Sequence, residues 1–264
     1  MLTIALIVIQ ITTSFLGIYF LDYQLDGRVN QVGVILLSIL VGFILMLVVL
    51  EAYIEILYYV FKKTPKNNIL KHKLANQMVS IPLHLTRTKI LVVGKEHLPK
   101  DYGFTIYSNH TSLMDIPLFM YGFNDYPIAF LAKKKVKDIF SVGKWVEALG
   151  GVMIDRTNTR KGAAAILQVI NHVKNGSTMV IFPEGTRNKE QGRLLPFKDG
   201  AFKVALKSKA PLVPMTILKE EKKVWPRKNT VKIVVHKPLS YEEIKGLKSQ
   251  DLSSRVKEII ASCL

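Results

Sequence analysis

Two long apolar segments at the start of the chain most constrain its fold. Residues 1–21 carry no charged side chain, and as a helix they would span about 32 Å, close to the roughly 30 Å hydrocarbon core of a bilayer. Residues 33–61 form a second apolar segment that contains Glu51 and Glu55. A mid-membrane carboxylate costs about 2.5 to 3.5 kcal/mol, so both acids are expected at an interface. We therefore expect residues 1–61 to be membrane-embedded, as two transmembrane helices or as a helical hairpin in one leaflet.

The charges that flank these segments predict which side of the membrane the rest of the chain occupies. Residues 22–31 contain two Asp and one Arg, whereas residues 62–73 contain five lysines and no acid. Under the positive-inside rule the basic side faces the cytoplasm. The N-terminus lacks the basic region and the clear small-residue cleavage site of a signal peptide. We expect a protein of the cell membrane with residues 62–264 on the cytoplasmic side.

The charge balance indicates anionic partners. The chain has a formal net charge of +17, and residues 1–61 contribute one Arg and four acids, so residues 62–264 carry +17 − (−3) = +20. Anionic lipid headgroups, a phosphorylated lipid, and an acidic carrier protein or CoA would all be attracted. Nucleic acid is not expected, because no nucleic-acid-binding module is recognisable. The single cysteine, Cys263, excludes an intrachain disulfide.

Residues 62–264 are expected to form one α/β domain, because short apolar runs alternate with helical patterns. The clearest helix, residues 161–174, is closed by Asn175-Gly176, and a final helix is expected over residues 251–262 with its apolar stripe in the core. The strand-like runs lie near residues 89–94, 103–108, 128–132, 151–155, 178–182, 211–217 and 230–236.

The segment Asn-His-Thr-Ser-Leu-Met-Asp at residues 109–115 is the first candidate site. It follows an apolar run, and either Thr111 or Ser112 is expected to cap a helix through residue 120. Positions five apart on a helix point about 140° away from each other. His110 must therefore precede the helix and fold back over its first turn to meet Asp115.

Two interpretations of this pair are compatible. In one, Asp115 is a capping-box acid paired with Ser112, and His110 is an exposed turn residue. In the other, neutral His110 takes a proton from a substrate alcohol while Asp115 fixes the histidine tautomer. No covalent nucleophile competes for this role, since the chain has no Gly-x-Ser-x-Gly elbow and its single cysteine is next to last.

A second candidate segment, Phe-Pro-Glu-Gly-Thr-Arg, occupies residues 182–187 and also ends an apolar run. Gly185 suits a backbone that closely approaches a ligand, and the Arg187 guanidinium matches phosphate oxygens. The alternative is a β-turn with an exposed Glu184–Arg187 pair. Between the two segments lie three lysines, 133–135, and the pair Asp155-Arg156.

These motifs resemble the signature of the glycerolipid acyltransferases, whose best-known members are the 1-acyl-glycerol-3-phosphate acyltransferases. The resemblance covers most of residues 85–220 and implies a single mixed-sheet α/β acyltransferase domain behind the two-helix anchor. It implies His110 and Asp115 as catalytic residues, with no metal or cofactor beyond an acyl-CoA or acyl-carrier-protein co-substrate. The residues that would bind the phosphate, the glycerol or the developing oxyanion are Lys133 (with Lys134 as a neighbouring candidate), Arg156, Glu184, Gly185, Thr186 and Arg187. The chain departs from the family at Phe140, where a proline is usual.

The resemblance implies direct attack of a substrate hydroxyl on an acyl thioester. The expected reaction moves a fatty acyl group to the sn-2 hydroxyl of 1-acyl-sn-glycerol 3-phosphate and forms phosphatidic acid. Two alternatives remain open. One is an acyltransferase for glycerol 3-phosphate or another lysophospholipid, and the other is a non-catalytic membrane protein that binds anionic lipid.

Overall fold

A computed structural model describes residues 2–25, 31–155, 157–188, 190, 192–219 and 229–264. The chain divides into two compact units, Met1–Lys63 and Thr64–Leu264. The expected domain boundary, after residue 61, lies two residues before this division.

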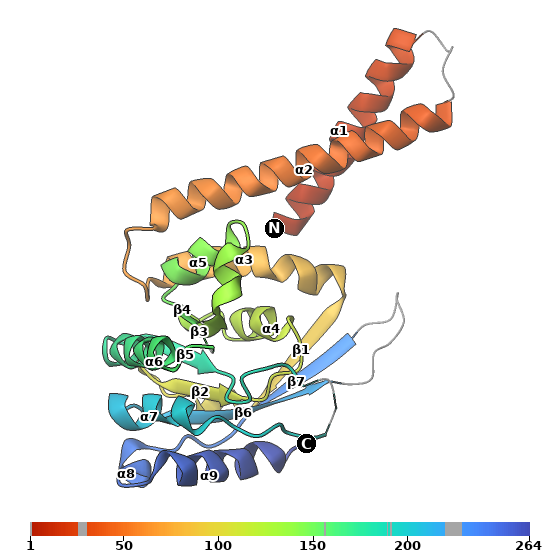
Figure 1. Cartoon of the computed structure of the whole chain (residues 1–264). Coiled ribbons are helices and arrows are strands. Elements are labelled where there is room, and N and C mark those ends of the chain that lie inside the picture. The colour runs from red at the N-terminus through yellow and green to blue at the C-terminus, as the bar shows by residue number, and fades with distance from the viewer. Residues whose placement is uncertain (1, 26–30, 156, 189, 191, 220–228) are drawn as a thin grey trace. The chain divides into compact units, whose positions relative to one another are not determined.

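The first unit consists of two helices, α1 (Leu2–Leu25) and α2 (Gln31–Phe61), which cross each other in Figure 1. Small side chains let them approach closely: a Cβ placed on Gly42 would lie 2.6 Å from Ser14 Oγ. Both helices are long and apolar enough to span a membrane, and most of their side chains are exposed. Apolar surface of this extent requires a nonpolar environment, which agrees with the expected membrane region.

The second unit is built on a seven-stranded mixed sheet with the order β1-β7-β6-β2-β5-β3-β4. All neighbours are parallel except β6 and β7, which are antiparallel. The seven predicted strands are confirmed: β1 (Thr88–Val93), β2 (Thr105–Ser108), β3 (Ile128–Lys133), β4 (Val152–Ile154), β5 (Thr178–Ile181), β6 (Leu212–Lys219) and β7 (Asn229–Val235).

Helices cover both faces of this sheet, and Figure 1 shows α3 and α4 toward one side and α7 and α9 toward the other. The predicted helices at 161–174 and 251–262 are confirmed as α6 and α9, and Leu252, Val256 and Ile260 of α9 are buried in the core as expected. The helices are α3 (Ile69–Leu85), α4 (Asp115–Gly122), α5 (Val142–Ala148), α6 (Thr159–Lys174), α7 (Lys203–Ser208), α8 (Tyr241–Ile244) and α9 (Ser249–Ala261). The described residues also form short 3₁₀ segments: η1 (Lys95–His97), η2 (Lys134–Asp138) and η3 (Asp199–Phe202).

The strands at the centre of the sheet are buried, so polar groups are expected beyond the ends of these strands. All four residues of β2 are buried, because β5 and β6 flank it and helices cover both faces. Since β2 runs parallel to both neighbours, the carboxyl ends of the three strands meet at one edge of the sheet. Ligands of open α/β sheets bind at this kind of edge.

Candidate active site

The first polar segment beyond β2, which we call the histidine turn (residues 109–115), holds His110 against Asp115. His110 Nδ1 lies 2.8 Å from Asp115 Oδ2, so the side chain does fold back over the start of α4 as predicted. The imidazole also stacks on Phe182, with 4.2 Å between ring centroids. An ionised carboxylate can only accept, so Nδ1 carries the proton and the lone pair is on Nε2. The ring is fixed from two sides with a basic nitrogen left for a ligand.

The Asp115 carboxylate is fully buried and organises the whole histidine turn. Its Oδ2 also accepts from the backbone N–H groups of Thr111 (2.6 Å) and Ser112 (2.9 Å), and its Oδ1 accepts from both of their hydroxyls. Burial alone would raise the pKa of Asp115. The hydrogen bond from His110, the Lys219 ammonium and the Ser112 N–H outweigh burial and hold this pKa well below its usual range.

The predicted cap of α4 is wrong. Neither Thr111 nor Ser112 is the N-cap residue; Met114 is, and its side chain makes no capping hydrogen bond. The reason is that Asp115 reaches back to the N–H groups of the turn, which leaves the Ser112 hydroxyl to accept from Met114 N at 3.1 Å. The aspartate therefore orders the turn in the way a capping side chain would, and it contacts the imidazole as well. The capping-box interpretation is therefore wrong in its cap residue, and the proton-transfer interpretation stays a prediction.

Two residues of this site had no role predicted from the sequence: Lys219, which was not singled out, and Asn109, which was named only as part of the segment. Lys219, at the end of β6, donates to Asp115 Oδ1 and to Ser112 Oγ, both at 2.7 Å. Asn109 is buried, and its amide group bonds both the carbonyl (3.0 Å) and the N–H (2.7 Å) of Ile217. Lys219 ends an apolar run beside β2. A lysine at that point was the only available signal.

The second polar segment, the arginine turn (residues 183–188), is attached directly to the first. Glu184 is 3% exposed, and its Oε1 accepts from His110 N at 2.8 Å while its Oε2 accepts from Leu195 N at 3.0 Å. In the other direction, Asn188 N donates to the His110 carbonyl at 2.7 Å. Burial raises the pKa of Glu184, and the two N–H donors partly offset this rise. The Glu184 carboxylate thus holds the backbone of the histidine.

The tip of the arginine turn is open. Gly185 has a φ of +73°, which an L side chain rarely adopts, so a glycine is required there. Thr186 and Arg187, which follow this glycine by one and two residues, are exposed. Arg187 therefore presents its guanidinium to solvent near the point where Glu184 anchors His110. Among the described residues, Glu184 forms no ion pair with Arg187; instead, its two oxygens accept from the backbone N–H groups of His110 and Leu195.

The lysines and arginine between the two turns differ in placement. Lys133 ends β3 opposite Ile154 of β4 and is exposed. Its neighbour Lys134 forms an ion pair with Asp155 at 3.4 Å. Arg156 lies outside the described residues. The structure therefore places Lys133 at the carboxyl ends of the parallel strands, where the two turns also lie.

An apolar groove of about 810 Å³ adjoins the arginine turn, and its volume is in the range of about 300 to 1,000 Å³ typical of ligand sites. Its walls come from α6, from the ends of β3 and β5, and from the segment after residue 194. The arginine turn contributes Glu184, Gly185 and Thr186. Its lining also includes Lys198, Lys203 and Lys207. The groove can take a long apolar group with an anionic end.

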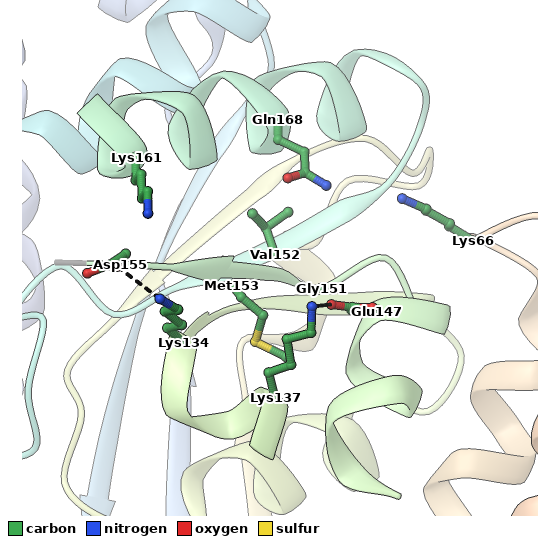
Figure 2. Close-up of a pocket in the computed structure, with 10 residues that line it drawn as sticks. All are labelled: Lys66, Lys134, Lys137, Glu147, Gly151, Val152, Met153, Asp155, Lys161 and Gln168. Atoms are coloured by element: carbon green, nitrogen blue, oxygen red, sulfur yellow. Dashed lines mark hydrogen bonds and ion pairs between the residues drawn. The ribbon is translucent and has the colours of Figure 1, made fainter. Parts of the chain in front are cut away.

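A second, smaller pocket of about 520 Å³ lies along β4, at the edge of the sheet (Figure 2). Lysines from η2 and α6 approach it, and Figure 2 shows Lys134 paired with Asp155 and Lys137 with Glu147. Within the described part of the chain, no group of three or more His, Cys, Asp or Glu side chains is arranged to hold a metal ion. The histidine turn places an imidazole beside a buried carboxylate, with Nε2 on the side of the ring away from Asp115.

Comparison with known proteins places this arrangement in a family. The family model described as Acyltransferase matches residues 89–218, which include both turns. A 1-acyl-sn-glycerol-3-phosphate acyltransferase of Bacillus subtilis is 31% identical over 182 residues, which are 66% of this chain and 89% of that protein. One from Borreliella burgdorferi is 36% identical over 139 residues, 53% of this chain, but the match spans only 55% of that protein's length.

A solved structure agrees with the fold. The 1-acyl-sn-glycerophosphate acyltransferase of Thermotoga maritima has a TM-score of 0.61 and 28% sequence identity, covering 73% of this chain and 77% of that chain. The predicted fold class, a single mixed sheet in an α/β acyltransferase domain, is confirmed. With its histidine turn and arginine turn bonded to each other inside the matched region, the chain belongs to the acyltransferase family that contains the 1-acyl-sn-glycerol-3-phosphate acyltransferases.

Proposed function

We propose that the protein transfers a fatty acyl group from an acyl thioester to the sn-2 hydroxyl of 1-acyl-sn-glycerol 3-phosphate, and so forms phosphatidic acid. The observation that carries this proposal is the 2.8 Å contact of His110 Nδ1 with buried Asp115, which leaves Nε2 as a base. The names of the relatives from Bacillus subtilis and Thermotoga maritima give the same substrate class for those proteins.

In the proposed reaction, His110 Nε2 takes the proton of the acceptor hydroxyl as its oxygen attacks the thioester carbonyl carbon. A carbon–oxygen bond forms, and the negative charge moves to the carbonyl oxygen. The tetrahedral intermediate then collapses, the carbon–sulfur bond breaks, and the imidazolium returns the proton to the departing thiolate. Asp115 stays ionised and stabilises the imidazolium between the two transfers. A positioned base of this type supplies about 100-fold to 10,000-fold in rate.

Phosphate recognition falls to the cations at the same sheet edge. Arg187 is exposed beyond Gly185 and offers a planar fork of donors to phosphate oxygens. Lys133 and Arg156 are proposed to share this task or to face the developing oxyanion. Glu184 is proposed to act on the acceptor indirectly, because its carboxylate is occupied by the backbone of His110 and Leu195.

The apolar groove beside the arginine turn is proposed to receive the acyl chain of the thioester donor. Its walls are apolar along α6, and the lysines in its lining suit the phosphates of CoA or of a carrier-protein arm. The protein is proposed to work on the cell membrane with residues 62–264 on the cytoplasmic side, in keeping with the lysines that follow the second apolar segment.

The proposed function is tested with the purified full-length chain and a matrix of substrates. Acceptors are 1-acyl-sn-glycerol 3-phosphate, glycerol 3-phosphate, a lysophospholipid with another headgroup, and monoacylglycerol. Each is offered acyl-CoA and acyl-carrier protein. We expect phosphatidic acid as the dominant product and none from His110→Ala. A faster reaction with glycerol 3-phosphate or another lysophospholipid would move the assignment to that acceptor, and a folded chain that acylates none would make it a lipid-binding protein.

Sidedness is tested separately in intact cells. In a Cys263→Ser background, the substitution Lys66→Cys places a single thiol just after the second apolar segment. We expect no reaction with a membrane-impermeant reagent added from outside. Labelling from outside would contradict the cytoplasmic orientation.

A further inference from the structure

Residues 139–142, which we call the phenylalanine tip, expose apolar side chains without a covering element of the described chain. Phe140 is 76% exposed, and Ile139 and Val142 are 53% and 45% exposed. Among the described residues of Thr64–Leu264, Phe140 is the most exposed of the large apolar side chains. Single exposed apolar residues are ordinary on protein surfaces, but three within four positions around a phenylalanine form a patch.

The backbone of the phenylalanine tip is held in a fixed and unusual form. Val142 N donates to the Phe140 carbonyl at 2.6 Å, and Gly143 N donates to the Ile139 carbonyl at 3.1 Å. Ser141 has a φ of +55°, a conformation that costs free energy for a residue with a side chain, yet Ser141 is buried while Phe140 points outward. A Cβ on Gly143 would meet the Lys137 carbonyl oxygen at 2.4 Å, so this turn is tightly packed from behind. The fold therefore presents the phenylalanine to its surroundings at a cost in strain.

Lysines precede and follow the phenylalanine tip in the sequence. Residues 133–147 contain five lysines and two acids, a net charge of +3. Lys144 lies over the Phe140 ring with Nζ 5.7 Å from its centroid. Figure 2 shows Lys134 and Lys137 reaching from η2, the segment just before the tip, into the pocket along β4. Aromatic and aliphatic side chains flanked by lysines are the composition that lies at a membrane interface, with the rings at the headgroup boundary and the ammonium groups on anionic lipid.

We propose that the phenylalanine tip is a second membrane contact of this protein, which inserts Phe140, Ile139 and Val142 into the headgroup boundary of an anionic leaflet. It is separate in sequence from the apolar segments of residues 1–61, and it begins six residues after Lys133 at the end of β3. The tip thus holds the acyltransferase unit against the leaflet that contains the proposed acceptor. This role rests on the proposed function only for its benefit to turnover, since the contact itself needs no catalysis.

The contact is measured on full-length protein, in a Cys263→Ser background, reconstituted at one copy per nanodisc. An environment-sensitive dye is attached at Phe140→Cys and, as the control, at Ser254→Cys on the exposed face of α9, which Figure 1 shows toward the opposite side of the sheet from α5. We expect blue-shifted emission and quenching by spin-labelled lipid at position 140 alone, and a larger effect in discs that contain phosphatidylglycerol than in pure phosphatidylcholine. A label at 140 as water-exposed as the one at 254, or shielded without quenching by lipid, would overturn the proposal.

Further variants test the lysines and the phenylalanine separately. Lys135→Gln/Lys137→Gln should abolish the preference for phosphatidylglycerol, whereas Lys245→Gln/Lys248→Gln, which also removes two lysines and one ion pair, should not. Phe140→Asp should lower turnover of a bilayer-embedded acceptor by about tenfold, the order expected for losing the burial of one large apolar side chain, and spare a short-chain soluble acceptor. Equal losses on both acceptors would mean a structural role. Absence of turnover in every variant would refute the proposed reaction and leave the dye measurement valid.

Discussion

The two polar turns of the site differ in how many of their side chains are held in place by contacts with the rest of the protein. In the histidine turn, the imidazole is bonded to a fully buried carboxylate and stacked on Phe182, and the backbone N–H and carbonyl of His110 both have partners in the other turn. In the arginine turn, Glu184 is buried and bonded, but Thr186 and Arg187 beyond it are exposed.

Under the proposed function, this contrast would separate the chemistry from the recognition of substrate. Groups that must act in the transition state gain from being fixed beforehand, because no free energy is then spent on ordering them during the reaction. Groups that recognise a headgroup must be accessible to it. The histidine turn should therefore control kcat, and the tip of the arginine turn should control KM.

The largest effect is expected from removing the base. His110→Ala should lower kcat by about 100-fold or more, since a positioned general base supplies at least that factor. The fold should survive, because the imidazole is a turn side chain and not part of the core. Single-turnover rates with saturating acceptor measure the fall in rate. Near-UV circular dichroism measures whether the variant keeps its fold. A near-normal kcat in a folded His110→Ala enzyme would contradict the expectation that the histidine turn controls kcat.

Arg187→Ala should be next in size and should act on KM. Loss of a charge-assisted contact of about 2 kcal/mol corresponds to roughly a 30-fold weaker apparent affinity for a phosphate-bearing acceptor. Arg187→Lys should recover only part of this, because the planar fork is lost. Monoacylglycerol, which has no phosphate, is the control acceptor. If the apparent affinity for both acceptors falls equally, Arg187 has a structural role and the arginine turn does not recognise the phosphate.

Glu184→Gln tests the residue that joins the two turns. An amide offers a single acceptor oxygen, so one of the N–H groups of His110 and Leu195 loses its partner. Loss of one buried hydrogen-bond acceptor costs about 1.4 kcal/mol. We therefore expect kcat to fall roughly tenfold and the KM for the acceptor lipid to stay almost unchanged. A rise in KM with normal kcat would instead assign Glu184 to direct binding of the glycerol hydroxyls.

The smallest expected effect belongs to Lys219→Met. Asp115 retains its bonds to His110, Thr111 and Ser112, and Lys219 is partly exposed, so its loss is expected to cost about 1 kcal/mol, or roughly fivefold in kcat. Lys219→Arg should restore most of it, because the positive charge returns. Unchanged kinetics in Lys219→Met would show that the backbone and hydroxyl donors alone are sufficient for Asp115.

Sequence reasoning found the local parts of this site and missed the distant ones. Helix geometry over five residues required His110 to precede α4 and fold back if it was to meet Asp115, and the structure shows this arrangement. The bond of Glu184 to His110 joins positions 74 residues apart, and that of Lys219 to Asp115 joins positions 104 apart. Neither follows from a local pattern, because each depends on which strands neighbour β2. The cap of α4 was predicted wrongly for a related reason: propensity favours Ser and Thr there, but the neighbouring carboxylate had already taken the N–H groups.

The fold was more predictable than the site, for a physical reason. Apolar runs with turn residues at their ends indicate buried strands wherever they pair, so all seven could be located without knowing the strand order. The helix α3 was not predicted. Its buried face contains polar residues such as Lys71 and Asn76, and Pro82 lies inside it, so its pattern is not that of an amphipathic helix.

The bonds of Asn109 to Ile217 have a consequence for how the protein is made. Synthesis runs from the N-terminus, so the histidine turn leaves the ribosome 108 residues before the strand that supports it. At about 5 to 20 residues per second, this interval is roughly 5 to 20 s. During that time the apolar helices of residues 1–61 have already emerged, whereas β6 and Lys219 do not yet exist. The nascent chain can thus reach the membrane before Asn109 and Asp115 have their partners on β6, and the proposed acyl transfer requires that β6 has joined the sheet.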